Sequence, residues 1–401
     1  MIALDVMGGD HAPQAIVHGA LLAAQESISI TLFGPHDLIT SLLEKLDVHW
    51  KRYPLYIAHA DQVIGMDDDP VLAVKTMPDS SLVQAVASVK NGTCQAVISA
   101  GSSGALMVAS TLILGRQEGV GRAAIAGFLP TKKGKVLALD LGANTEVRPE
   151  HLYQFAHLGA TYVAAVSGIK RPRVALLANG HEEGKGSALV KQAHALLKKS
   201  TLNFIGNAEP HHVFNHEMDV IVCDGFTGNV LLKTSEAVTD MFSSWLAQGI
   251  ADYSNSQVRT LRVDSSSLSG LDTRVALLTA IGVEASRYDR EEDHSGQLES
   301  SEALSLRKLQ QPSVMGGREQ LMDEMDARQV RAIGDFIQTS IDARLDYKGV
   351  GGALLLGVNG TVVVCHGSSD AQTIQRAITF AWGILTPGVN IQKEIIKTVQ
   401  L

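Results

Sequence analysis

The sequence predicts an α/β fold with a mainly parallel sheet flanked by helices. Runs of four to six Val, Ile, Leu and Ala residues alternate with segments of helical periodicity, which is typical of strands buried on both faces. Six such runs end in a short cluster of Gly, Ser, Asn or Asp that opens a helical segment. Backbone N–H groups and a positive helix end meet at these junctions, so the pattern favours an enzyme that handles phosphate.

The six junctions are spread along the whole chain. They are IALDV into MGGDHAP, AVISA into GSSGAL, VLALD into LGANTEVRP, VALLAN into GHEEGKG, VIVCD into GFTGNV, and TVVVC into HGSSDA. The first elements are expected, in order, as a strand at Ile2–Val6, a helix from Pro13, a strand at Ile28–Gly34, a helix from Asp37, a strand at Leu55–Ala58 and a helix at Ser81–Lys90. Pro13 and Pro149 suit first-turn positions, where a missing N–H costs nothing.

Two neighbouring runs predict a local hairpin rather than a parallel pair of strands. Val136–Leu141 follows soon after Ala123–Phe128, with only TKKGK and a few flanking residues between them. So short a connection joins antiparallel strands, and its tip is expected to be basic and solvated.

The rhythm of strands and helices fails from Tyr253 to Gln311, where SSSLSG and DREEDHSGQLESSE show little periodicity. We interpret this stretch as an insertion, with its acidic run as a solvated loop rather than a metal site. Apolar residues then recur mostly at helical spacing over Leu321–Leu345, which indicates core packing, dimer packing or a membrane-surface helix. The expected domains are an α/β core of 1–250 and 346–401, and a peripheral region of 251–345 for dimer or membrane contact.

Composition limits the function classes. The net charge of −8 argues against nucleic acid as a partner. No run approaches the roughly eighteen apolar residues that a membrane-spanning helix needs, and the N-terminal sequence lacks the features of a signal peptide, which together indicate a cytoplasmic protein. Cys94, Cys223 and Cys365 lack the paired spacing of a zinc site or a disulfide framework, so they are expected to be buried thiols.

Taken together, the motifs resemble one family. MGGDHAP, ISAGSSGALM, LDLGANTEVRPEHL, NFIGN, VIVCDGFTGNVLLKTSE and GGALLLGVNGTVVVCHGSS are similar, in the same order, to the phosphate acyltransferase (PlsX) family of bacterial phospholipid synthesis. The resemblance spans nearly the whole chain outside Tyr253–Gln311. It implies a fold related to isocitrate and isopropylmalate dehydrogenases and to phosphotransacetylase.

The resemblance also implies a reaction. Inorganic phosphate cleaves a long-chain acyl thioester on acyl carrier protein, and a membrane acyltransferase then uses the acyl phosphate on glycerol 3-phosphate. It further implies a homodimer, with peripheral contact to the inner face of the plasma membrane as a possibility. Such a reaction needs donors and cations around the phosphate and the oxyanion, because phosphate is already an anionic nucleophile and a thiolate leaves easily. We therefore expect no cofactor, no metal and no covalent nucleophile.

DGFTGNVLLK is the segment most typical of a phosphate clamp. Asn229 and Lys233 lie four residues apart on one expected helix face, and Gly228 lets the backbone approach a ligand. The alternative is a capping asparagine and a surface lysine. Lys185 offers a second cation between two glycines, with a solvated loop lysine as its alternative.

Other candidates follow the remaining strands. Asp5 could position a donor or accept a proton, and Gly8 and Gly9 would expose backbone to phosphate. Asn144 could donate to an oxyanion or stabilise a turn. His366 could donate to phosphate or satisfy local backbone. Donors are also expected at the start of the helix after ISA, from Ser102, Ser103 and Gly104, with N-capping as the competing role of the serines.

Three features depart from the resemblance. Ser102-Ser103 stands where the family usually has Asn-Thr, His181 replaces what is more often a glutamate, and the connection from Lys233 to Tyr347 is longer than expected. These changes leave open a scaffold that has lost catalysis, and the glycine loops would equally fit an acyl-coenzyme A-dependent phosphotransacylase.

Docking of the acidic carrier protein is expected to be electrostatic. The candidates are two basic clusters in predicted loops, for which plain solvation is the alternative reading: Lys132, Lys133 and Lys135, and Lys170, Arg171 and Arg173.

Overall fold

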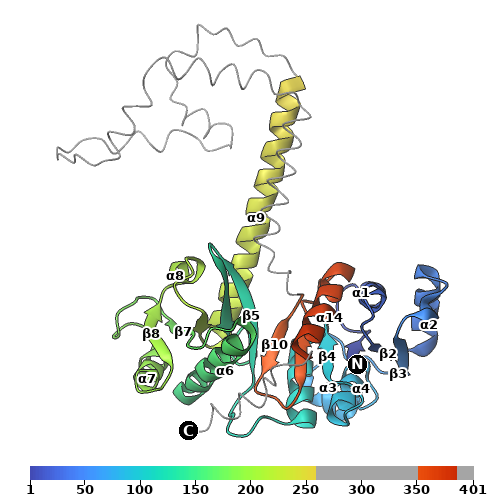
Figure 1. The fold of residues 1–401 in the computed structure, drawn as a ribbon, viewed down its shortest axis with the longest axis horizontal. Coiled ribbons are helices and arrows are strands. Elements are labelled where there is room, and N and C mark those ends of the chain that lie inside the picture. The colour runs from blue at the N-terminus through green and yellow to red at the C-terminus, as the bar shows by residue number, and fades with distance from the viewer. Residues whose placement is uncertain (259–350, 386–401) are drawn as a thin grey trace. The chain divides into compact units, whose positions relative to one another are not determined.

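A computed structural model describes residues 1–258 and 351–385 (Figure 1). Its strands are β1 Ile2–Asp5, β2 Ile30–Gly34, β3 Leu55–His59, β4 Ala96–Ser99, β5 Ala124–Thr131, β6 Gly134–Leu139, β7 Arg173–Leu177, β8 Asn203–Ala208, β9 Val220–Val222, β10 Ala353–Leu356 and β11 Thr361–Val364. Its α-helices are α1 Gln14–Gln25, α2 His36–Leu46, α3 Pro70–Thr76, α4 Ser81–Lys90, α5 Ser103–Ala109, α6 Pro149–Ser167, α7 Ala188–Leu197, α8 Pro210–Phe214, α9 Gly225–Val258 and α14 Ala371–Leu385. A 3-10 turn covers Trp50–Arg52, and a π-helical turn, Ser110–Leu114, extends α5.

All eleven of these strands form one sheet, in the order β3-β2-β1-β4-β11-β10-β5-β6-β9-β7-β8. β3, β2, β1, β4 and β11 are mutually parallel. β10 is antiparallel to both β11 and β5, and β5 is antiparallel to β6. β6, β9, β7 and β8 are again parallel to one another. Because three antiparallel pairings separate the two parallel sets, the sets run in opposite directions.

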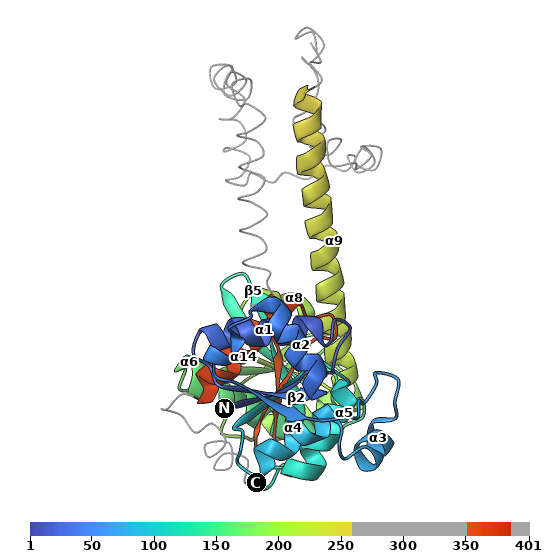
Figure 2. The same cartoon turned by 90° about the vertical axis from the view of Figure 1, so that its right-hand side faces the viewer.

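Side chains alternate between the two faces of the sheet, and each face has its own core. Ile2 and Leu4 of β1 lie in the core formed with α1, α2, α14, α6 and α7, whereas Ala3 lies in the core formed with α3, α4, α5 and α9. Figure 2 shows α1 and α14 on one side of β2 and α4 and α5 on the other. Strands covered on both faces explain the continuous apolar runs of the sequence.

The structure confirms the predicted α/β class and all six predicted junctions. β1, β4, β6, β7, β9 and β11 each end in a polar cluster that leads into α1, α5, α6, α7, α9 and α14 respectively. The hairpin is also confirmed, with Thr131 paired to Gly134 at its tip. Pro149 is the first residue of α6. The predicted helix at Leu321–Leu345 and nearly all of the predicted insertion lie outside the described residues.

The chain divides into two compact units, Met1–Glu236 with Asp346–Leu401, and Ala237–Leu345. The sheet belongs wholly to the first unit. The division expected from the sequence, at residues 250 and 346, stays a prediction. Within 1–258 and 351–385, no helix is long and apolar enough to cross a membrane.

The contact between α1 and α14 allows a test of the packing. A Cβ on Gly19 of α1 would lie 2.6 Å from the carbonyl oxygen of Ala371 and 2.7 Å from Cβ of Ile374, whereas a Cβ on Gly383 of α14 would meet nothing within 4 Å. Gly19→Ala should therefore destabilise the protein by about 1–3 kcal/mol through overpacking. Gly383→Ala should stabilise it by about 0.5–1 kcal/mol through helix propensity. Urea unfolding measures both values, and equal effects would contradict this packing.

Candidate active site

Strand reversal divides the predicted site residues between two edges of the sheet. The β1 edge, where β1, β4 and β11 end, carries Gly8, Gly9, Ser102, Ser103, Gly104 and His366. The β6 edge, where β6, β7 and β9 end, carries Asn144, Lys185, Gly228 and Asn229. The strand ends that the sequence marks as anion sites thus form two groups.

At the β1 edge, Asp5 is a buried residue whose carboxylate forms hydrogen bonds within the fold and is not open to a ligand. Its carboxylate accepts hydrogen bonds from the hydroxyls of Ser81 at 2.6 Å and Ser99 at 2.7 Å, and from the backbone N–H of Met7 at 3.3 Å. Burial raises the pKa of Asp5, against the lowering effect of these hydrogen bonds. The side chain, 2% exposed, joins β1 to β4 and α4.

The loops of the β1 edge pack backbone to backbone. A Cβ on Gly8 would lie 2.6 Å from the backbone nitrogen of Gly101, and the N–H of Asp10 donates to the carbonyl of Gly367 at 2.8 Å. Gly9 has a φ of +111°, a conformation that favours glycine. These close approaches explain why glycines recur here.

The serines at this edge differ in role. Ser102 caps α5, because its Oγ accepts a hydrogen bond from the N–H of Ala105 at 3.3 Å. This is the N-capping role that the sequence offered as the alternative to phosphate binding. Ser103 is exposed on the first turn of α5, and Gly104 packs against Pro70.

At the β6 edge, Asp140 is the counterpart of Asp5. This buried carboxylate accepts from the backbone N–H groups of Ile125, Ala143 and Asn144, and from Nδ2 of Asn144 at 2.9 Å. Burial raises its pKa, opposed by those hydrogen bonds. Nδ2 of Asn144 also donates to the carbonyl of Ala123 at 2.7 Å, so both amide hydrogens are committed within the fold. Asn144 thus fits the turn-stabilising alternative better than an oxyanion donor.

Helix α9 starts at the β6 edge and reaches the β1 edge. The N–H of Gly225 donates to the carbonyl of Asn144 at 2.8 Å, and Asn229 lies against Gly142. About one turn beyond Asn229, Nζ of Lys233 lies 2.7 Å from Nε2 of His366 and 2.9 Å from Oε2 of Glu236. Two residues 133 positions apart in sequence are thereby brought together.

The imidazole of His366 has partners at both ring nitrogens. Nε2 lies against the ammonium of Lys233, and Nδ1 lies 2.7 Å from Oγ and 3.2 Å from the backbone nitrogen of Ser368. The Lys233 side chain is 47% exposed. An anion could therefore reach the ammonium from solvent.

Lys185 lies apart from this contact. It is exposed in the loop between β7 and α7, where its backbone N–H donates to the carbonyl of Glu182 at 3.0 Å. His181, one of the departures from the family pattern, lies in the same loop with Nδ1 3.9 Å from Glu209.

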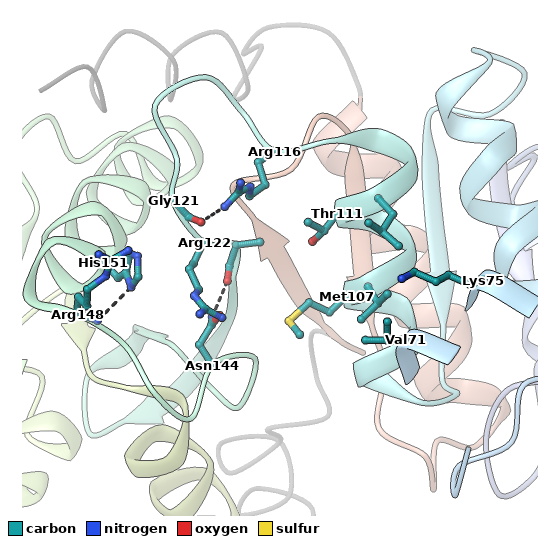
Figure 3. A pocket seen from close by; sticks show the side chains of 13 residues that line it. Val71, Lys75, Met107, Thr111, Arg116, Gly121, Arg122, Asn144, Arg148 and His151 are labelled. Carbon is teal, nitrogen blue, oxygen red and sulfur yellow. Dashed lines mark hydrogen bonds between the residues drawn. The ribbon is translucent and has the colours of Figure 1, made fainter. Parts of the chain in front are cut away.

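A pocket of about 570 Å³ opens beside Asn144 (Figure 3). Val71 and Met107, from α3 and α5, lie on one wall. Four cations also line it: Lys75, Arg116, Arg122 and Arg148. Sequence reasoning missed these cations because they come from three separate segments. Two features of the sequence could have indicated them. One is the GRQEGVGR stretch, in which two arginines flank glycines, and the other is the arginine of LDLGANTEVRPEHL.

The charge of the pocket acts on His151, which also lines it. Burial lowers the pKa of His151, and the nearby guanidinium groups of Arg122, Arg148 and Arg116 lower it further. Neutral Nδ1 accepts from the backbone N–H of Arg148 at 3.1 Å. Among the residues that the structure describes, no Asp or Glu lines this pocket.

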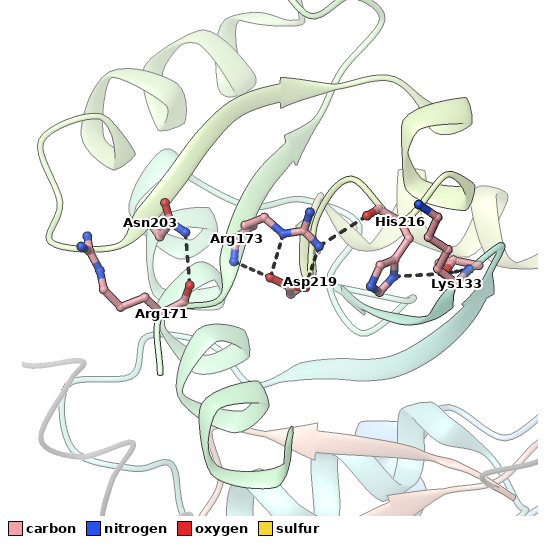
Figure 4. A network of polar contacts seen from close by, with 7 residues as sticks. Lys133, Arg171, Arg173, Asn203, His216 and Asp219 are labelled. Carbon is pink, nitrogen blue, oxygen red and sulfur yellow. Dashed lines mark hydrogen bonds and ion pairs between the residues drawn. The ribbon is translucent and has the colours of Figure 1, made fainter. Parts of the chain in front are cut away.

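The predicted docking clusters lie at the starts of strands β6 and β7, which are at the same end of the sheet as the ends of β1, β4 and β11. Lys132, Lys133 and Lys135 are at the β5–β6 hairpin, and Lys170, Arg171 and Arg173 precede or begin β7, so both clusters lie where β6 and β7 start. Arg173 is paired with Asp219, its Nη2 lying 2.9 Å from Oδ1 (Figure 4). Burial would raise the pKa of Asp219, but hydrogen bonds from Arg173 hold it below its ordinary value.

Figure 4 also shows what joins the two clusters. His216 lies between Arg173 and Lys133; its carbonyl accepts from Nη2 of Arg173, and its Nδ1 contacts Oγ1 of Thr131 at 3.0 Å. Arg173 therefore has a structural role in joining these segments.

No cluster of three or more His, Cys, Asp or Glu that could hold a metal ion occurs within 1–258 and 351–385.

Comparisons with known proteins identify the family. Residues 1–273 and 321–392 match the family model described as "Fatty acid synthesis protein". A phosphate acyltransferase of Heliobacterium modesticaldum is 40% identical over 95% of this chain and 92% of its own length. A phosphate acyltransferase of Citrifermentans bemidjiense is 35% identical over 97% of this chain and 90% of its own. The chain is thus a fatty acid synthesis protein by class. Within that class, it belongs to the phosphate acyltransferase family.

Among solved structures, a phosphotransacetylase from Streptococcus pyogenes is similar over 59% of this chain and 81% of that chain, with 16% sequence identity and a TM-score of 0.45. Residues 274–320 lie outside the family match and overlap the predicted insertion.

The charge around His151 gives a test of the pocket's electrostatics. Arg122→Gln removes a positive charge and should raise the pKa of His151, measured by NMR titration of its ring resonances. His151 in the parent should titrate below its ordinary value of 6.5, so its contribution to the free energy of unfolding is present above that pH and lost as the pH falls. An unchanged pKa in Arg122→Gln would contradict the arrangement.

Proposed function

We propose that this protein transfers a long-chain acyl group from the thioester of acyl carrier protein to inorganic phosphate. The observation that carries the proposal is the match to phosphate acyltransferases along at least 95% of the chain. The Lys233–His366 contact supports it, because it joins a cation and a second polar group at loops shaped for close backbone approach.

The reaction needs little from the protein beyond binding. A phosphate oxygen attacks the thioester carbonyl, the C–S bond breaks, and the proton of hydrogen phosphate is passed to the departing thiolate. Acyl phosphate and the free carrier thiol result. The ammonium of Lys233 would lie against the phosphate and offset its charge, and His366 would hold that ammonium in place through Nε2. Holding the phosphate in line with the carbonyl accounts for much of the acceleration.

The remaining predicted residues have weaker support. Gly8 and Gly9 lie in the loop after β1, where Gly9 packs against Gly367, and Ser103 has an exposed hydroxyl at the same edge. Gly228 lies in the first turn of α9 against the backbone of Asp140. Asp5 and Asn144 would act by holding the loops, because their polar atoms are engaged internally. Carrier docking by the two basic clusters stays a prediction, and both clusters lie where β6 and β7 start.

The cellular setting forms part of the proposal. On the Ala237–Val258 part of α9, Val238, Phe242 and Trp245 are 52%, 51% and 62% exposed. An apolar row at near-helical spacing suits a second copy of the chain or the surface of a bilayer. The protein would work in the cytoplasm, as a homodimer or peripherally on the inner face of the plasma membrane, and pass acyl phosphate to the glycerol 3-phosphate acyltransferase.

The activity has a direct test. Long-chain acyl carrier protein and inorganic phosphate should give acyl phosphate, trapped as the hydroxamate, with release of one thiol per product. Turnover only with acyl-coenzyme A would replace the proposal by a phosphotransacylase. Folded protein that is silent with both donors would favour a scaffold that has lost catalysis.

Lys233→Ala should lower kcat/KM at least about 100-fold, because it removes the cation beside the attacking phosphate. The matched control is Lys199→Ala, which removes an exposed lysine just after α7 and should leave the rate unchanged. A Lys233→Ala protein with the parent's rate would place the phosphate elsewhere.

A further inference from the structure

The pocket beside Asn144 has an apolar wall and a cationic wall. In Figure 3, Val71 and Met107 lie on the wall formed by α3 and α5, and Arg122 and Arg148 face them from the loop before β5 and the start of α6. Lys75 extends from α3 toward the opposite wall. A ligand with an apolar stretch and an anionic group fits such an arrangement, and the volume of about 570 Å³ is that of a small-molecule site.

The cations of this pocket outnumber the anions near it. Among the residues that the structure describes, four positive side chains and no carboxylate line it, in a chain whose net charge is −8. Burial lowers the pKa of His151, and Arg122, Arg148 and Arg116 lower it further against the raising effect of Glu150. Lys75 makes no hydrogen bond or ion pair within the described ranges. Like charges held together without a counter-ion disfavour the fold, which makes an anionic ligand the natural partner.

The arginines are held in set positions. Nη1 of Arg116 donates to the carbonyl of Gly121, and Nη1 of Arg122 lies 3.5 Å from Oδ1 of Asn144. Each guanidinium keeps further N–H groups for a ligand, and its planar fork matches two oxygens of a phosphate.

From this arrangement we infer that the pocket binds the phosphopantetheine arm of the acyl donor, with Arg122, Arg148 and Lys75 on its phosphate and the apolar wall along its pantetheine and acyl part. The inference rests on the proposed function and names the part of the substrate that this pocket recognises. The same phosphate-bearing arm occurs in coenzyme A, so the assignment holds for either thioester donor.

The attacking inorganic phosphate is the other anion of the reaction, and the pocket suits it less. An oxyanion that develops beside it would need uncommitted donors, and the amide hydrogens of Asn144 are both used. The cations Lys75, Arg116, Arg122 and Arg148 are exposed and come from three elements, which suits recognition of an extended group better than enclosure of a small reacting one.

Binding of 4′-phosphopantetheine and of pantetheine to the full chain, measured by calorimetry, tests the inference without any turnover. Phosphopantetheine should bind more tightly than pantetheine. Arg122→Gln, Arg148→Gln and Lys75→Gln should each weaken phosphopantetheine about tenfold and leave pantetheine unchanged. Lys199→Gln removes an exposed charge outside the pocket and should change neither. Lys75→Gln guards against misfolding, because that side chain has no hydrogen-bond or ion-pair partner among the described residues, and the melting temperatures of all variants are compared.

Equal binding of the two probes, or variants that weaken both alike, would overturn the assignment. A rise in KM for inorganic phosphate, with phosphopantetheine binding unchanged, would overturn it in favour of a nucleophile site. A protein that binds phosphopantetheine through these cations but forms no acyl phosphate would uphold the arm site and refute the proposed reaction.

Discussion

The reversal of strand direction at the centre of the sheet is the constraint on which the candidate site depends. In a wholly parallel sheet, every strand would end at one edge and its loops would meet there. Here β10 and the β5–β6 hairpin interrupt the parallel order, so β1, β4 and β11 end opposite to β6, β7 and β9. Something must then bridge the edges, and the first turns of α9 do so. From Gly225 to Lys233, eight residues at about 1.5 Å each span roughly 12 Å.

Each edge is organised by a buried carboxylate at the end of a strand. Asp5 and Asp140 both follow a leucine and precede a glycine-containing loop, and both accept several hydrogen bonds from neighbouring elements. Burial of a charge is costly, which is why the pKa of each is raised. Removing either would leave hydroxyl or N–H donors unpaired inside the protein, at about 1–3 kcal/mol for each donor. Their role is therefore to hold the loops on which ligand-facing groups stand.

The sequence predicted the local elements well because their signals are local. Apolar runs, Gly-rich junctions and the short TKKGK tip each depend on a few neighbouring residues, and the strands and helices were found where these signals lay. Strand direction depends on which strands pair, and no run of residues encodes its partner. For the same reason the sequence left two roles open for Asn144, an oxyanion donor or a turn stabiliser. Its commitments are to Ala123, twenty-one residues earlier, and to Asp140, and they become visible only once the strands are in register.

The cationic pocket was also hidden in the sequence, because its residues come together only in the folded chain. Lys75, the Arg116–Arg122 loop and Arg148 are scattered singly among ordinary surface residues in the sequence, whereas the lysine-rich hairpin tip stands out in it. In the fold, the hairpin tip lies where β6 starts, and the scattered cations line one pocket. Asn144 borders that pocket, and its carbonyl is bonded to the first residue of α9. One rigid helix thus relates the pocket to Lys233, which would fix the distance between a donor's arm and the phosphate that attacks its thioester.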